Sequence, residues 1–135
     1  MKVVILAAGR GTRLGKAYPK TLTSLKDGKS ILLHQIEGLC QYVNIGDISI
    51  VVGYKKDMIM EAFPSLSYID NDSYHKTNTS QSLLIALNHI AYEDILWLNG
   101  DIVFDHRVIG RLLEYGKSCM AVNTAQVGDE EVKYR

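Results

Sequence analysis

The fold of this chain is decided by residues 3–22, which read VVILAAGRGTRLGKAYPKTL. The stretch opens with an apolar run over residues 3–8 that has the length of a fully buried strand. A glycine turn from Gly9 to Gly11 follows without a spacer, and cationic side chains come directly after it. No acidic residue precedes Asp27, although the net charge of the whole chain is zero. The stretch therefore predicts a buried strand that ends in a locally cationic, glycine-rich loop.

Such a loop is suited to binding a polyphosphate. Its glycines allow backbone N–H groups to approach a ligand closely, and a helix beginning near Thr12 would add the positive end of its dipole. Arg13 would contact phosphate oxygens through its planar fork, and Lys20 would do so as a point charge. Pro19 biases Tyr18 toward an extended backbone and so fixes where Lys20 is presented. The alternative interpretation of this stretch is a basic turn between a strand and a helix that has only a packing role.

Two familiar phosphate-binding loops do not match this sequence. A Walker loop requires four residues between its glycines and then Gly-Lys-Ser/Thr, which is absent. A dinucleotide fingerprint requires a third glycine where Leu14 stands and an acid at the end of the second strand, where residues 53–54 are Gly-Tyr. A dinucleotide-binding oxidoreductase domain is therefore disfavoured. Tight binding of NADH without binding of any NTP would favour this hypothesis again.

The length and composition of the chain are typical of one globular domain. The chain has 135 residues, of which 47% are hydrophobic and 22% charged, and its zero net charge argues against a general nucleic-acid binder. No segment approaches the ~20 apolar residues of a membrane helix, and the N-terminus does not have the pattern of a signal peptide. Cys40 and Cys119 lack metal-site spacing, so they are expected to be buried thiols in a reduced, cytoplasmic protein.

Hydrophobic periodicity predicts strands and helices in alternation. Strands are expected over residues 3–8, 48–52, 66–69, 95–98 and 118–123, and helices over 30–42, 55–63, 81–90 and from Asp105 to Gly116. Ser30 is the expected cap of the first of these helices, and Thr79 or Ser80 of the third, with Leu83, Leu84, Leu87 and Ile90 as the core face of that third helix. This order predicts a three-layer α/β/α fold around a mostly parallel sheet.

Ligands in such sheets bind beyond the carboxyl ends of the strands, near the point where strand order reverses. Three predicted strand ends, at residues 9–13, 53–54 and 100–101, are expected to open onto one crevice. Asp101 follows an apolar strand and a glycine, and a carboxylate that faces a cationic phosphate loop suits Mg²⁺. A simple turn cap is the alternative for Asp101, and for Asp105 the helix-capping interpretation is the favoured one.

The polar loop over residues 70–79 and the start of the helix after it supply a third group, Asn71, Tyr74, Asn78 and Ser82. Short polar side chains at the mouth of a helix can read the edge of a nucleobase, as can its free backbone N–H groups. Hydrogen bonding within the loop and its cap is the alternative interpretation for all of these residues.

Three motifs together resemble the nucleotidyltransferases that activate sugars and alcohol phosphates with an NTP. The first is Leu6-Ala-Ala-Gly-x-Gly-Thr-Arg-Leu with Pro19-Lys20-x-Leu22, and the second is the run LNGDIVFD at residues 98–105. The third, N-x-x-Y-x-x-x-N-x-x-x-S-L from Asn71, is similar to the bacterial phosphocholine cytidylyltransferase branch. The resemblance covers nearly the whole chain. It implies a Rossmann-like fold of the nucleotide-diphospho-sugar transferase type.

The resemblance also implies a reaction, in which an acceptor phosphate attacks the α-phosphorus of an NTP and pyrophosphate leaves. CTP is the favoured NTP, and the acceptor is expected to be a phosphocholine-like alcohol phosphate or a sugar 1-phosphate. Arg13 and Lys20 are the implied catalytic residues, and Asp101 is the implied ligand of Mg²⁺. The implied nucleotide-binding residues are Leu6, Ala7, Ala8, Gly9, Gly11, Thr12, Asn78, Ser82 and Gly100. Base or acceptor contact is slightly favoured for Asn78 and Ser82 and stays level with loop bonding for Asn71 and Tyr74.

Members of this family continue into a second half that binds the acceptor. Residues 1–135 are therefore expected to be a single nucleotide-binding, N-terminal portion that is truncated at its C-terminus. Its partners would be the NTP, the phosphorylated acceptor and either a second copy or a missing C-terminal half, with no nucleic acid and no membrane. A non-catalytic NTP-binding domain is the alternative function.

Overall fold

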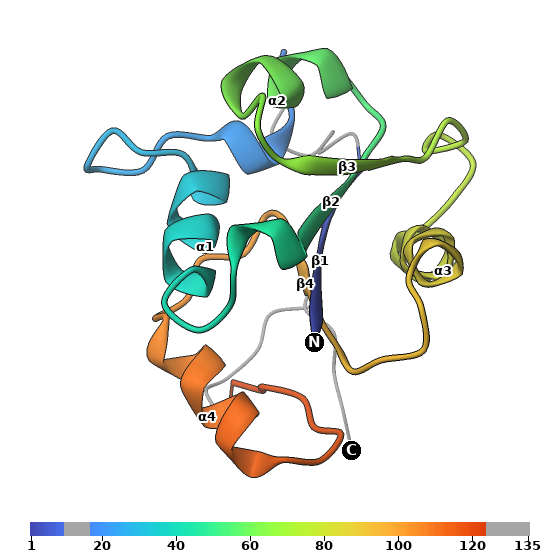
Figure 1. Ribbon diagram of the computed structural model, residues 1–135. Helices are drawn as coiled ribbons and strands as arrows, with labels where there is room; N and C mark the ends of the chain where they lie inside the picture. The colour runs from blue at the N-terminus through green and yellow to red at the C-terminus, as the bar shows by residue number, and fades with distance from the viewer. Residues whose placement is uncertain (10–16, 124–135) are drawn as a thin grey trace.

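The computed structural model describes residues 1–9 and 17–123 (Figure 1). Its strands are β1 (Lys2–Ala7), β2 (Ile48–Val52), β3 (Ser67–Asp70) and β4 (Ile95–Asn99). Its helices are α1 (Ile31–Leu39), α2 (Lys56–Ala62), α3 (Thr79–His89) and α4 (Arg107–Tyr115), with 3₁₀ turns η2 (Lys20–Leu22) and η3 (Ile45–Asp47). No helix among the described residues combines the length and the apolarity needed to cross a membrane.

The described strands form one parallel sheet in the order β3-β2-β1-β4. β1 is central: Val3 pairs with Ile48 on one side and with Leu96 on the other. The chain moves outward from β1 through β2 to β3 and then returns to the far side of β1 to form β4, so strand order reverses between β1 and β4. This arrangement confirms the predicted three-layer, parallel α/β/α fold.

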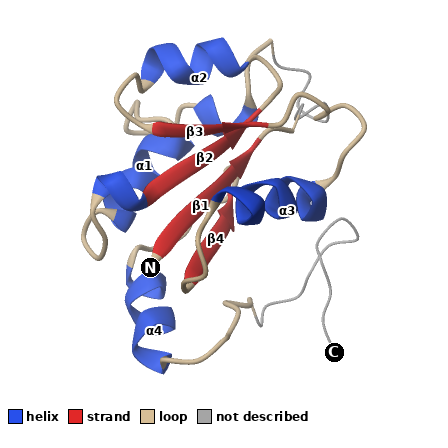
Figure 2. Cartoon of the chain, turned by 45° about the vertical axis from the view of Figure 1, so that its right-hand side comes forward, coloured by secondary structure: helices blue, strands red, loops and turns tan. Residues whose placement is uncertain are grey.

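Helices cover both faces of the sheet, as Figure 2 shows. Side chains alternate along β1, so Val3 and Ile5 pack with α1, α2 and α4, whereas Val4 and Leu6 pack with α3. Leu32 of α1 is fully buried at the centre of the first layer. Among the described helices, α3 is the one that packs on the second face, and its N-terminus lies beside the carboxyl end of the central strand.

The start of α3 differs from the sequence prediction. Asn78, rather than Thr79 or Ser80, is the N-cap, since its side chain accepts a hydrogen bond from the Gln81 N–H at 3.1 Å. The Gln81 Oε1 in turn accepts a hydrogen bond from the Asn78 N–H at 3.0 Å, which completes a capping box. This reciprocal pair satisfies two helix-start N–H groups, and the helix therefore begins at Thr79.

The buried face of α3 is also different from the predicted one. Ser82 and Ala86 are buried, four residues apart on one face, whereas Leu84 is 56% exposed and Leu87 is 40% exposed. Leu83 packs partly against the core, as expected. The small buried side chains allow the helix to lie close to β1, and Leu84 and Leu87 are turned outward.

The predicted strand over residues 118–123 is not formed, and these residues are irregular and exposed. A strand requires a hydrogen-bonded neighbour, and no described strand pairs with the outer side of β4. The predicted helix from Asp105 begins at Arg107, and its N-cap is His106 rather than the expected Asp105. The Asp105 carboxylate accepts a hydrogen bond from the Arg107 N–H at 2.9 Å. The helix ends at Gly116 with φ 70° as expected. Cys40 and Cys119 are exposed, which contradicts the expectation of buried thiols.

Candidate functional site

A cleft of about 260 Å³ lies at the carboxyl ends of β1 and β4, opposite the N-terminus of α3. Its walls come from four segments, Leu6 to Gly9, Lys20 with Thr21, Thr77 to Thr79 with Ser82, and Asn99 to Asp101. The cleft sits where strand order reverses, which is where ligands bind in open α/β sheets. Of the residues that the family resemblance implied as catalytic, nucleotide-binding or metal-binding, Gly11, Thr12 and Arg13 lie outside the described residues, and all the others line this cleft.

Lys20 and Asp101 form an ion pair across the cleft. The Lys20 Nζ donates to the Asp101 Oδ2 at 3.1 Å, and the two side chains are 36% and 42% exposed. Pro19, with φ −57°, leads into η2 and places Lys20, while Asp101 follows the end of β4. A solvent-exposed pair of this kind contributes little stability, so a ligand can separate it at small cost.

Gly100 brings the end of β4 against the end of β1. Its N–H donates to the Leu6 carbonyl at 2.8 Å. A Cβ at this position would lie 3.0 Å from the Leu6 oxygen, 3.1 Å from the Ala7 Cβ and 3.2 Å from the Thr21 Oγ1. Only glycine fits there without displacing these neighbours. The residue type that the motif predicted therefore has a steric reason in this cleft.

Gln35 holds the loop that carries Asp101, a role that the sequence did not reveal. Its Nε2 donates to the Asn99 carbonyl at 3.0 Å and to the Ile102 carbonyl at 2.8 Å, and the side chain is buried. The one signal was a polar residue on the apolar face of the helix predicted over residues 30–42. Thr21 was also missed: it lines the cleft, it is buried, and its Oγ1 has no hydrogen-bond partner among the described residues.

A buried amide lies behind the α3 side of the cleft. Asn71 donates through Nδ2 to the Thr77 Oγ1 at 2.8 Å and to the Ser82 Oγ at 3.0 Å. Asn71 itself does not line the cleft, and Tyr74 packs on the core cluster beneath Gly53. For both residues, whose role the sequence left open, the structure favours the local interpretation. Thr77 enters the site in their place.

The end of β2 supports the cleft without lining it, which corrects the expectation that three strand ends share one crevice. The Tyr54 N–H donates to the Ala8 carbonyl at 3.1 Å, and the Lys55 Nζ donates to the Ala17 carbonyl at 2.6 Å. Lys55 adopts a left-handed backbone with φ 48°. Two consecutive residues after β2 therefore hold Ala8 and Ala17.

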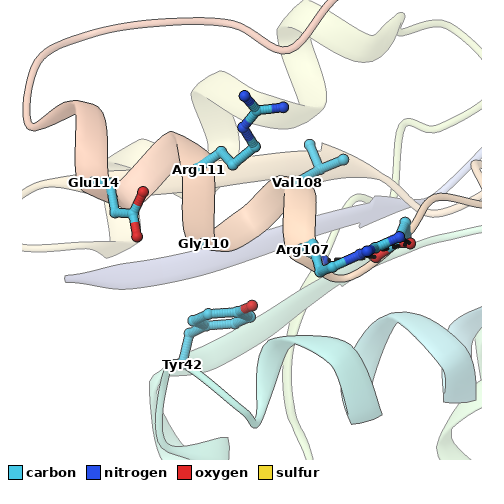
Figure 3. Close-up of a pocket in the computed structure, with 7 residues that line it drawn as sticks. Tyr42, Arg107, Val108, Gly110, Arg111 and Glu114 are labelled. Carbon is cyan, nitrogen blue, oxygen red and sulfur yellow. Dashed lines mark hydrogen bonds and ion pairs between the residues drawn. The ribbon is translucent and has the colours of Figure 1, made fainter.

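A larger cavity of about 640 Å³ lies between the end of α1 and α4 (Figure 3). Figure 3 shows Tyr42 facing α4 next to Gly110, and a Cβ on Gly110 would lie 3.0 Å from the Tyr42 ring. Arg107, one of the two arginines that line this cavity, pairs with Asp105, and its Nη2 lies 2.6 Å from the Asp105 Oδ2. Hydrogen bonds from Arg107 hold the pKa of the Asp105 carboxyl well below its usual range. None of the four described strands ends at this cavity, so the smaller cleft is the better candidate site.

The donor set of the cleft fits a magnesium ion that is shared with phosphates. Asp101 is the carboxylate of the described lining, and no group of three or more His, Cys, Asp or Glu side chains gathers anywhere in residues 1–9 and 17–123. Mg²⁺ binds through one or two carboxylates and completes its octahedron with substrate phosphates and water. The residues present therefore fit an ion that enters with a polyphosphate.

A parallel sheet with a glycine-lined cleft at its switch point, and a cation facing a carboxylate across that cleft, defines an α/β domain of the nucleotide-binding class. Residues 3–132 match the MobA-like NTP transferase domain, and the chain belongs to this family. The family resemblance that the three motifs predicted is confirmed.

Two curated relatives illustrate the family. The bifunctional protein GlmU of Methanococcus maripaludis is 38% identical over 97% of this chain, which spans 31% of that protein. The CMP-5'-(3-aminopropyl)phosphonate synthase of Streptomyces rubellomurinus is 32% identical over 83% of this chain and 19% of its own length. The chain thus spans a third or less of the length of these relatives.

Two solved structures share the fold. The CTP:phosphocholine cytidylyltransferase LicC of Streptococcus pneumoniae matches with a TM-score of 0.61 and 34% identity, over 74% of this chain and 44% of that one. A nucleotidyl transferase from Methanothermobacter matches with a TM-score of 0.69 and 24% identity, over 84% of this chain and 56% of that one. These matches confirm the predicted nucleotidyltransferase fold of the Rossmann-like type.

Proposed function

We propose that this chain is the nucleotide-binding portion of a nucleotidyltransferase that transfers NMP from an NTP to a small phosphorylated acceptor and releases pyrophosphate. CTP is the proposed donor, and a phosphocholine-like alcohol phosphate or a sugar 1-phosphate is the proposed acceptor. Two of the similar proteins support cytidine chemistry, since one is a CTP:phosphocholine cytidylyltransferase and the other is a CMP-5'-(3-aminopropyl)phosphonate synthase.

The observation that carries the proposal is the Lys20–Asp101 pair in a cleft that Gly9 and the α3 N-terminus also line. Phosphoryl transfer needs positioning and charge neutralisation more than proton transfer from the protein. In the proposed reaction Lys20 contacts the α-phosphate and the incoming acceptor phosphate. Arg13 and the amides of residues 9–12 contact the leaving pyrophosphate, while Ala7, Gly9 and Ser82 contact the base or the ribose.

Asp101 is the residue proposed to hold Mg²⁺, which when bound would neutralise charge on the α-phosphate. Binding of the nucleotide would then separate Lys20 from Asp101, and Lys20 would contact phosphate oxygens instead. We further propose a cytoplasmic protein in which the acceptor is bound by parts other than residues 1–135, in a C-terminal half or in a second copy.

The first test measures binding of the four NTPs, each with Mg²⁺, to the complete protein. CTP is expected to bind and to stabilise the fold by ~2.7 kcal/mol at a hundredfold excess over Kd. Chelation of Mg²⁺ is expected to weaken this binding. Tight binding of NADH without binding of any NTP would instead favour an oxidoreductase domain.

The second test measures pyrophosphate release with phosphocholine and with sugar 1-phosphates as acceptors. Lys20→Ala and Arg13→Ala are each expected to lower the rate by about 10²–10³-fold, as loss of a transition-state charge partner does. Lys26→Ala is the matched control, because Lys26 is an exposed lysine outside the cleft. Full rate in the Lys20 variant contradicts its proposed role, and NTP binding without pyrophosphate release for any acceptor favours a non-catalytic domain.

A further inference from the structure

Asn71 is the most buried polar side chain of the described chain, with 1% of its surface exposed, and it stands directly behind the cleft. It follows β3, and its backbone N–H donates to the Val52 carbonyl at 2.8 Å, which fixes the residue to the sheet. Its side chain is held by three further hydrogen bonds, so each of its polar atoms faces a defined partner.

The orientation of this amide is determined by a group that can only donate. The Ser73 backbone N–H points at one terminal atom of Asn71 from 3.1 Å, so that atom must be the carbonyl oxygen. The other terminal atom is then the NH₂ group. It faces the Thr77 Oγ1 at 2.8 Å and the Ser82 Oγ at 3.0 Å, one hydroxyl for each of its two hydrogens.

This arrangement fixes the direction of the two hydroxyl groups. A hydroxyl that accepts a hydrogen bond from Asn71 must direct its own single hydrogen elsewhere. In the described part of the chain neither hydroxyl donates to another protein group, and both residues line the cleft. Thr77 and Ser82 therefore present hydrogen-bond donors on the ligand side.

We infer that Asn71 is a positioning residue that makes Thr77 and Ser82 a donor pair for the base of the bound nucleotide. This inference rests on the proposed function. The pair selects a base edge with two adjacent acceptors, because each unpaired buried hydroxyl hydrogen is unfavourable. Cytosine offers N3 and O2 as such acceptors, whereas uracil places an N3–H donor between its two oxygens. The site is accordingly selective for CTP over UTP.

Asn71→Asp tests this inference by reversing the hydroxyl groups. The carboxylate keeps its acceptor for the Ser73 N–H but accepts from both hydroxyls, which leaves only oxygen lone pairs facing the ligand. Thr77→Val removes one donor with little change of shape and leaves Asn71 in place. Ser73→Ala is the control, since the bond to Asn71 uses the backbone N–H of an exposed residue.

The measurement is the ratio of the CTP and UTP dissociation constants of the complete protein with Mg²⁺, with thermal unfolding to verify folding. The wild-type protein and Ser73→Ala are expected to prefer CTP by about tenfold or more, and Asn71→Asp and Thr77→Val to lose at least most of this preference. An unchanged ratio in a folded Thr77→Val protein overturns the inference even where Asn71→Asp does not fold. Wild-type preference for UTP overturns it as well, whereas failure to bind any NTP overturns the proposed function first.

Discussion

Gly100 shows how the absence of a single side chain shapes the cleft. Because a Cβ there would meet the Leu6 carbonyl oxygen at 3.0 Å, Gly100→Ala is expected to lower the free energy of unfolding by about 1–3 kcal/mol and to weaken nucleotide binding. Urea denaturation measures the first effect and equilibrium NTP binding the second.

Gly46→Ala is the matched control, since no atom lies within 4 Å of the position of its Cβ. Its stability is expected to be unchanged or slightly raised, because alanine restricts the unfolded chain. Equal stability of the two variants would show that the end of β4 tolerates a side chain beside β1.

At the scale of single residues, the sequence predicted most of the charged and motif residues that line the cleft and missed Gln35, Thr21 and Thr77, which belong to no motif. Lys20 and Asp101 could be predicted because a local cationic run and a Gly-Asp after an apolar strand are visible in one dimension. Gln35 could not be assigned, because its partners Asn99 and Ile102 are more than 60 residues away along the chain. A side-chain amide shows what it can bind, but not which carbonyl the fold brings to it.

The elements were predicted well in their order and less well in their faces. The burial of α3 was misjudged because leucines are the more apolar residues, yet Ser82 and Ala86 allow closer approach to the sheet. The N-cap of α3 was mispredicted because Asn78, Thr79 and Ser80 are all residue types that favour the N-cap position. Only the capping-box partner Gln81 distinguishes Asn78 from the other two. Short apolar strands were located closely because their length and flanking turns mark both ends.

The N-terminus of α4 should contribute stability that depends on pH. Hydrogen bonds from the Arg107 side chain and backbone lower the pKa of the Asp105 carboxyl, and His106 lies nearby. A lowered folded-state pKa contributes stability that is fully present above the ordinary value of 3.8 and is lost as pH falls through the folded value.

Comparison of the wild-type protein with Asp105→Asn should reveal this contribution. The difference in the free energy of unfolding is expected to be constant above about pH 5 and to shrink as the pH falls below the ordinary carboxyl value. Asp72→Asn is the control, because its carboxylate is 88% exposed and lies 3.9 Å from Lys56. A difference that grows on acidification would contradict the assigned ion pair.

The whole molecule depends on two apolar layers on either side of one sheet. Leu32→Ala is expected to lower the free energy of unfolding by about 2–5 kcal/mol, because Leu32 is fully buried and its truncation leaves a cavity. Leu84→Ala makes the same chemical change on the exposed side of α3 and is expected to alter stability by about 0.5 kcal/mol or less. Chemical denaturation of both variants measures the contrast, and similar losses would mean that α3 buries its leucines after all.

At this scale the sequence predicted the layers and the sheet edge at which the candidate cleft lies, because alternating strands and helices admit few topologies. It did not predict which strand has a neighbour. Residues 118–123 have a strand-like composition, but a strand forms only beside a partner, and that partner is not encoded locally. The same limit applies to β1, whose central place follows from pairing with β2 and β4 rather than from its own residues.

The central place of β1 in the sheet has a consequence for folding during translation. Lys2–Ala7 is made before its two neighbours, so one of its edges can be completed only after Ile48–Val52 has emerged and the other only after Ile95–Asn99 has. A newly made, strongly apolar strand must therefore wait for most of the chain to be translated, a state in which unpaired strands associate with the wrong partners. The segment that lines the candidate nucleotide site is also the one that most needs protection during synthesis.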